Sequence, residues 1–163
     1  MSVQLNADEV FEIAEQIERN GGKFYRKAAG FAQDEDSRAM LTRLAEMEDD
    51  HERTFSAMRA TLPDEARQSM VYDPANESIM YLQALADGEV FDVRADPSAA
   101  LTGAESLVDI LRMAIGRETE SVVFYEGMKA TVPPNAGHAG IDRIIREELG
   151  HIAVLSKRLA QER

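Results

Sequence analysis

Two short motifs in this chain place a carboxylate and an imidazole three residues apart. They are Glu48 and His51 in "EMEDDHERTF", and Glu148 and His151 in "EELGHIAVL". Residues three apart on a helix share one face, and in both motifs that face also carries apolar residues that should be buried. Carboxylate oxygens and imidazole nitrogens are suitable ligands for iron or manganese. The two motifs therefore indicate metal chemistry inside a helical protein.

Both motifs belong to an internal repeat with an offset of 100 residues and no gaps. Surface charges have no reason to repeat in register, so the matched polar residues are the informative ones. Neighbouring acids do not repeat, since Glu147 corresponds to Met47, and Glu46 corresponds to Arg146. The matched polar and aromatic pairs include Glu18 with Glu118, Phe24-Tyr25 with Phe124-Tyr125, Arg43 with Arg143, Glu48 with Glu148, and His51 with His151.

The repeat therefore predicts four buried glutamates and two buried histidines. A buried carboxylate without compensation costs several kcal/mol, and Arg43 and Arg143 cannot neutralise four of them. Two divalent metal ions could neutralise all four carboxylates. One glutamate from each of two helices, with Glu-x-x-His from each of the other two, is the ligand pattern of di-iron and di-manganese carboxylate proteins. The predicted ligands are Glu18, Glu48, His51, Glu118, Glu148 and His151.

Three further features lie near the predicted ligands or between the helices. Tyr25 and Tyr125 fall about two turns from the glutamates on their own helices, so their hydroxyls either bond a ligand on a neighbouring helix or are ordinary core groups. Gly21-Gly22 indicates either close helix packing or a local bulge near the site. His138, in "PPNAGHAG", has no counterpart in the first half and is predicted to lie in a loop.

Helical periodicity covers four segments that would position these residues: 5–32, 36–62, 102–132 and 141–160. Capping-box patterns mark two starts, Asn6 with Glu9 and Thr102 with Glu105. "DEDS" separates the first two helices and Pro133-Pro134 the last two. The connection 62–101 is too long for a turn, and a short helix is predicted within 77–91, ending near Gly88. Two repeated hairpins joined by a long crossover predict an all-α, antiparallel, ferritin-like four-helix bundle.

Composition narrows the possible functions. The length of 163 residues fits a single domain, 1–163. The absence of cysteine excludes disulfides, zinc ribbons, thiolate-bound iron and cysteine nucleophiles, and it agrees with a cytoplasmic location. The net charge of −12 argues against nucleic acid as a partner. No signal peptide is evident and no apolar run reaches the roughly 20 residues of a membrane span, so no membrane association is expected.

The pairing of "ERNGGKFY" with "EMEDDH", and of "ETESVVFY" with "EELGH", resembles the rubrerythrin-like branch of the ferritin-like superfamily. The resemblance implies a homodimer with two iron ions. Glu48 and Glu148 would bridge the ions, Glu18 and Glu118 would be terminal ligands, and His51 and His151 would each complete one iron.

Two departures from that family matter. The chain has no cysteine to ligate a rubredoxin iron, so electrons must come from a separate protein or reductant. Rubrerythrins also carry an extra carboxylate three residues after the third-helix glutamate, where this chain has Ser121. Glu120 is adjacent, but a two-residue step directs it to another face of the helix.

The expected function is that of a di-iron oxidoreductase that reacts with hydrogen peroxide or dioxygen, with Tyr25 and Tyr125 assisting through hydrogen bonds to the ligands. Manganese or zinc could replace iron. One alternative is ferritin-like iron binding and storage with ferroxidase activity. Another is a structural bundle that holds zinc or no metal.

Overall fold

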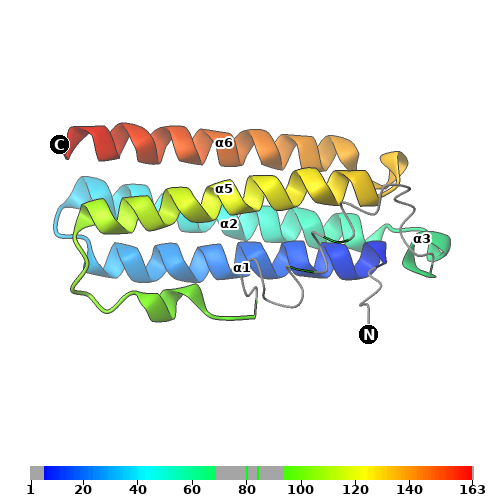
Figure 1. Cartoon of the computed structure of the whole chain (residues 1–163), viewed down its shortest axis with the longest axis horizontal. Helices are drawn as coiled ribbons and strands as arrows, with labels where there is room; N and C mark the ends of the chain where they lie inside the picture. Colours follow the sequence, from blue (N-terminus) through cyan, green and yellow to red (C-terminus); the bar gives the residue numbers. More distant parts are fainter. Residues whose placement is uncertain (1–5, 69–79, 81–83, 85–93, 163) are drawn as a thin grey trace.

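The computed structural model describes residues 6–68, 80, 84 and 94–162. Within them, four long helices lie side by side along the long axis of the molecule (Figure 1). They are α1 (Ala7–Phe31), α2 (Glu35–Ala60), α5 (Leu107–Thr131) and α6 (His138–Gln161). The predicted four-helix bundle is confirmed. Within the described part of the chain, no helix has the length and apolar character that crossing a bilayer requires.

The bundle is built from two antiparallel hairpins, α1 with α2 and α5 with α6, as the repeat predicts. Between α1 and α2, Asp34 caps the second helix by accepting from the backbone N–H of Ser37 at 2.8 Å. Helices α2 and α5 run in the same direction, so the chain must return along the bundle between them (Figure 1). This return requires the long connection seen in the sequence.

The connection contains the short helix α3 (Asp64–Gln68) and the 3-10 turn η1 (Pro97–Ala100). The segment η1 lies along α1, where Lys27 Nζ donates to the carbonyl of Ser98 at 2.8 Å. Most of the helix predicted for 77–91 lies outside the described residues. Met80 and Ala84, which are described, are both helical.

The first predicted capping box is present and the second does not start a helix. Asn6 and Glu9 bond reciprocally at 2.8 and 3.0 Å at the start of α1. Helix α5, however, begins at Leu107, behind a capping box formed by Ser106 and Asp109. Thr102 and Glu105 do bond each other, at 2.7 Å between their side chains, but in the turn before the helix.

The intervening Gly103 explains why the helix does not start at Thr102, because its φ of +90° is incompatible with a right-handed helix.

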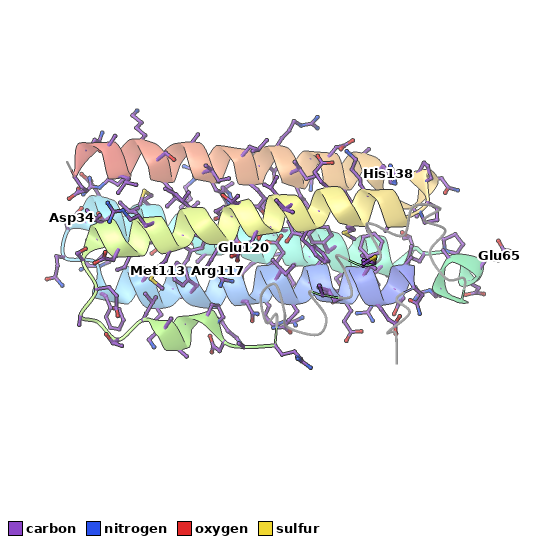
Figure 2. All side chains as sticks on the ribbon, viewed as in Figure 1. Asp34, Glu65, Met113, Arg117, Glu120 and His138 are labelled. Atoms are coloured by element: carbon purple, nitrogen blue, oxygen red, sulfur yellow. The ribbon has the colours of Figure 1, made fainter. Side chains whose placement is uncertain are left out.

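The prediction that His138 lies in a loop was also wrong. After η2 (Pro134–Ala136), Gly137 turns the chain with φ +120°, and His138 is the first residue of α6 (Figure 2). Its ring Nε2 lies 2.7 Å from the carbonyl oxygen of Val132, which fixes the ring against the end of α5.

The hydrophobic core consists of two clusters with a polar layer between them. One cluster is formed by the first half of α1, the end of α2, the end of α5 and the start of α6. The other is formed by the opposite ends of the same helices. On each long helix, the predicted ligands fall between the residues of the two clusters. The apolar layers therefore hold the polar residues at mid-height, away from both ends of the bundle.

Candidate metal centre

All six predicted ligands converge in the middle of the bundle, one from α1, two from α2, one from α5 and two from α6. Each side chain is almost fully buried, with at most 4% of its residue surface exposed. They form two overlapping groups, and within each group one ligand atom per residue lies within 4.8 Å of the others. The groups are Glu18, Glu48, His51 and Glu148, and Glu48, Glu118, Glu148 and His151.

Glu148 lies at the centre of this arrangement. Its Oε1 is 2.9 Å from Nδ1 of His51, and its Oε2 is 2.9 Å from Nδ1 of His151. The two imidazole rings stack with their centroids 5.6 Å apart. Glu18 lies 3.4 Å from Nδ1 of His51, and Glu118 lies 3.4 Å from Nδ1 of His151. Each histidine thus faces one outer glutamate and a shared central carboxylate.

Several of these buried polar atoms have no hydrogen-bond partner, despite their short separations. Buried polar atoms are almost always paired, so such a concentration calls for an explanation. Carboxylate oxygens and imidazole Nδ1 atoms that point at a common centre fit divalent cations. The unpartnered atoms are Glu18 Oε2, Glu48 Oε1, both carboxylate oxygens of Glu148, Nδ1 of His51, and both ring nitrogens of His151.

The electrostatics of the cluster favour bound protons unless cations replace them, except at Glu118, where burial would raise the pKa but hydrogen bonds, chiefly with His151, lower it. Burial, reinforced by the neighbouring carboxylates, raises the pKa of Glu18 and Glu148 to about 7 each. Burial raises the pKa of Glu48 well above its usual range as well. Burial disfavours the charged histidines, but the facing carboxylates outweigh it and raise the pKa of His51 to about 11 and that of His151 to about 12.

The two predicted tyrosines bond the outer glutamates crosswise. Tyr25 on α1 donates its hydroxyl hydrogen to Oε1 of Glu118 on α5, and Tyr125 on α5 donates to Oε1 of Glu18 on α1. Burial, together with the nearby carboxylates, raises the pKa of both tyrosines well above the usual range. The hydroxyls therefore remain donors, and at Glu18 the second oxygen stays directed at the cluster.

Gly21 allows Glu48 to approach α1. A Cβ atom added at Gly21 would collide with Oε2 of Glu48, and one at Gly22 would come within 3.1 Å of Oδ1 of Asp49. Helix α1 continues unbroken through both glycines. Close helix packing is therefore the correct interpretation of the glycine pair, and it occurs at the site. The residue at the equivalent position of the second half is Ser121, which is also buried.

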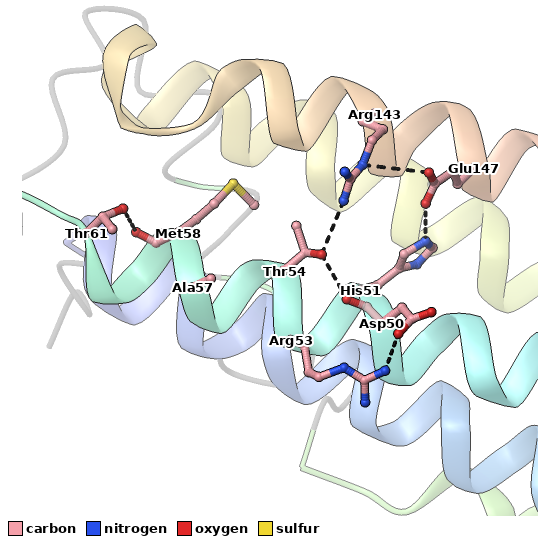
Figure 3. Close-up of a pocket in the computed structure, with 9 residues that line it drawn as sticks. All are labelled: Asp50, His51, Arg53, Thr54, Ala57, Met58, Thr61, Arg143 and Glu147. Carbon is pink, nitrogen blue, oxygen red and sulfur yellow. Dashed lines mark hydrogen bonds and ion pairs between the residues drawn. The ribbon is translucent and has the colours of Figure 1, made fainter.

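The residue that sequence reasoning missed is Glu147. Its Oε2 lies 2.7 Å from Nε2 of His51, and its Oε1 lies 3.7 Å from Nε of Arg143. Arg143 in turn donates to the hydroxyl of Thr54 at 3.3 Å (Figure 3). Glu147 has no acidic counterpart in the first half, so the repeat excluded it. No local signal in the sequence distinguishes it from exposed acids on the other helices, such as Glu120 (Figure 2).

Two cavities on the outside of the bundle, both lined mainly by residues of α2 and α6, each have one of the two histidines in their wall. One, of about 770 Å³, has His51 and Glu147 in its wall (Figure 3). The other, of about 680 Å³, has His151, Met47 and Glu147 in its wall. Each histidine therefore borders a separate cavity through which a small molecule could approach.

Comparison with known proteins supports the fold. No family model and no curated protein sequence matches the chain. Among solved structures, the chain is similar to a Thermotoga maritima protein proposed to be a ferritin-like diiron-carboxylate protein. The TM-score is 0.71 at 18% sequence identity, over 98% of each chain. At that identity the likeness extends to the architecture of a ferritin-like helical bundle.

Proposed function

We propose that this chain binds two metal ions, iron by preference, and acts as an oxidoreductase of rubrerythrin type. The oxidant would be hydrogen peroxide or dioxygen, and a separate protein would supply electrons. One observation carries the proposal: two overlapping groups of buried carboxylates and imidazoles share Glu48 and Glu148, and most of the atoms that face one another lack partners.

The six predicted ligands form two sets that share Glu48 and Glu148. Glu18 and His51 would hold one ion, Glu118 and His151 would hold the other, and the two central glutamates, Glu48 and Glu148, would lie between them. Bound iron would supply Lewis acidity and the change of oxidation state. The tyrosine hydroxyls hold the outer carboxylates in place, and the apolar clusters above and below exclude water.

The cavities beside His51 and His151, of about 770 and 680 Å³, leave room for peroxide or dioxygen to approach the two histidines. The bundle has no cysteine that could ligate a rubredoxin-type iron, so we propose that a separate protein donates the electrons. A homodimer remains our expectation from the family resemblance, and a cytoplasmic location remains our expectation from the absence of cysteine.

Ferroxidase activity linked to iron storage is the second candidate, and Ser121 favours it. Ser121 is 8% exposed and stands where the resemblance to rubrerythrins implies an extra carboxylate. A hydroxyl there cannot act as an additional anionic ligand. The net charge of −12 would also attract ferrous ions to the surface. Storage predicts a large cage-like assembly, and size-exclusion chromatography separates that from a dimer.

Anaerobic loading with iron(II), followed by rapid mixing with peroxide or with oxygen, tests the proposal. We expect two ferrous ions per chain and their oxidation by at least one oxidant. Faster oxidation by peroxide supports the rubrerythrin-type reaction, and faster oxidation by oxygen supports ferroxidase activity. A chain that binds fewer than two ions, or whose ions react as slowly as free iron, contradicts both.

A further inference from the structure

The outer nitrogens of the two histidines have different surroundings, although the inner nitrogens are alike. Nδ1 of each ring faces the central glutamate at 2.9 Å. On the outer side, Nε2 of His51 bonds Glu147 at 2.7 Å, whereas Nε2 of His151 is buried and has no partner among the described residues. The two halves of the site are therefore not equivalent.

A single difference between the repeats accounts for this asymmetry. Glu147 on α6 corresponds to Met47 on α2, and Met47 lines the same cavity as His151. A thioether offers at best a weak acceptor. Glu147 also borders that cavity, but its two oxygens face His51 and Arg143. The other side chains that line it include Met40, Leu44 and Val154, which are apolar.

The bond to Glu147 is held in place on its far side. The carboxylate is 39% exposed, so a lone contact to His51 would compete with water. Arg143 lies 3.7 Å from the other carboxylate oxygen and is itself bonded to Thr54 on α2. This chain of contacts spans α6 and α2 (Figure 3) and keeps the carboxylate directed at the imidazole.

A carboxylate on the outer N–H of a metal-binding histidine fixes the tautomer and the ring orientation, and it makes the inner nitrogen a stronger ligand. Loss of such a partner typically weakens metal binding 10- to 100-fold. We propose that Glu147 is a positioning residue that makes the two metal positions unequal, so that the position held by His51 binds its ion more tightly than the position held by His151.

This inference rests on the proposed dinuclear site, and cobalt(II) can test it without any measurement of activity. Chelator-treated protein would be titrated anaerobically with cobalt(II), followed by visible absorption and calorimetry. We expect two binding steps whose affinities differ about 10- to 100-fold. Replacing His51 by Gln should remove the tighter step, and replacing His151 by Gln should remove the weaker one.

Variants at Glu147 and Met47, the residues beside the outer nitrogens of the two histidines, test whether Glu147 causes the difference in affinity. Glu147→Gln, which keeps the shape of the side chain, should weaken only the tighter step, by about 10- to 100-fold. Met47→Glu should strengthen only the weaker step, because it offers His151 the carboxylate that His51 already has. Glu46→Gln removes an exposed charge from α2 and should leave both steps unchanged.

Two results would overturn the inference, and they are distinguishable. If the wild-type chain binds two ions but Glu147→Gln behaves like Glu46→Gln, the role of Glu147 is wrong while the dinuclear site stands. If the wild-type chain binds fewer than two cobalt ions, the dinuclear site itself is wrong and the inference falls with it.

Discussion

The hydroxyl of Tyr25, on α1, donates a hydrogen bond to the buried carboxylate of Glu118, on α5, across 93 positions of sequence. Its counterpart Tyr125 bonds Glu18 in the reverse direction. These two bonds connect the two hairpins at the polar layer, where neither of the two apolar clusters joins them. They hold the outer glutamates in position and also help to join the halves of the bundle.

Replacing Tyr25 by Phe should therefore destabilise the protein. The change leaves a carboxylate oxygen of Glu118 buried without its donor, which costs about 1–3 kcal/mol. The free energy of unfolding, measured by urea denaturation of chelator-treated protein, checks this. Thr119→Val removes an exposed side-chain bond to the carbonyl of Ile115 and should change stability by less than about 0.5 kcal/mol. Equal effects of the two variants would show that the tyrosine bond is not structural.

Replacing Gly21 by Ala should impair both the fold and metal binding. The added methyl group would collide with the Glu48 carboxylate, and overpacking in a tight interior costs about 1–3 kcal/mol. Gly30 on the same helix provides the matched control, because a Cβ there meets nothing within 4 Å. Gly30→Ala should stabilise the helix by up to about 1 kcal/mol. In thermal melts, Gly21→Ala should lower the melting temperature and Gly30→Ala should raise it slightly. In metal titrations, only Gly21→Ala should weaken binding, and similar results for the two variants would contradict the close approach of Glu48.

The metal-free protein should lose stability as the pH rises from about 5 to 8. The pKa values of Glu18 and Glu148 are about 7 in the folded state, above the ordinary 4.5, and that of His51 is about 11, above 6.5. The folded state therefore holds more protons than the unfolded chain across this window, and its stability falls as pH rises. The expected decrease is at least about 1.4 kcal/mol, the equivalent of one pKa unit.

Urea denaturation at several pH values measures this slope directly. Saturation with a divalent metal should reverse it, because the ligands must lose their protons to bind the ion and metal binding strengthens with pH. Stability of the chelated protein that rises between pH 5 and 8 would contradict the electrostatics of the cluster.

The bundle and the six converging residues could be predicted because they depend on features that the sequence repeats. The stripes around Leu44 and Ile144 predict helices, and the fixed offset separates Glu48 and Glu148 from their acidic neighbours. The tyrosine hydroxyls could be placed only as alternatives, because sequence spacing does not say which neighbouring helix a side chain reaches.

The start of α5 and the role of Glu147 could not be predicted, because they depend on backbone conformation and on contacts between helices, which sequence spacing does not show. Two overlapping capping signals precede α5, and only the left-handed backbone of Gly103 selects Ser106 over Thr102. Glu147 was excluded because it breaks the repeat, yet its contact with His51 joins helices α6 and α2. Matching the two halves of the repeat selects only residues that occur in both halves, so it cannot identify a residue such as Glu147 that occurs in one.

Metal content with and without the shared carboxylates is the most direct test of the proposed centre. Wild-type chain, the double variant Glu48→Ala with Glu148→Ala, and the control Glu46→Ala would be loaded anaerobically with iron(II), freed of excess ion and analysed. We expect two ions per chain in the wild type and the control, and loss of both from the double variant. Unchanged stoichiometry in a folded double variant, verified by circular dichroism, would contradict a dinuclear site at these residues.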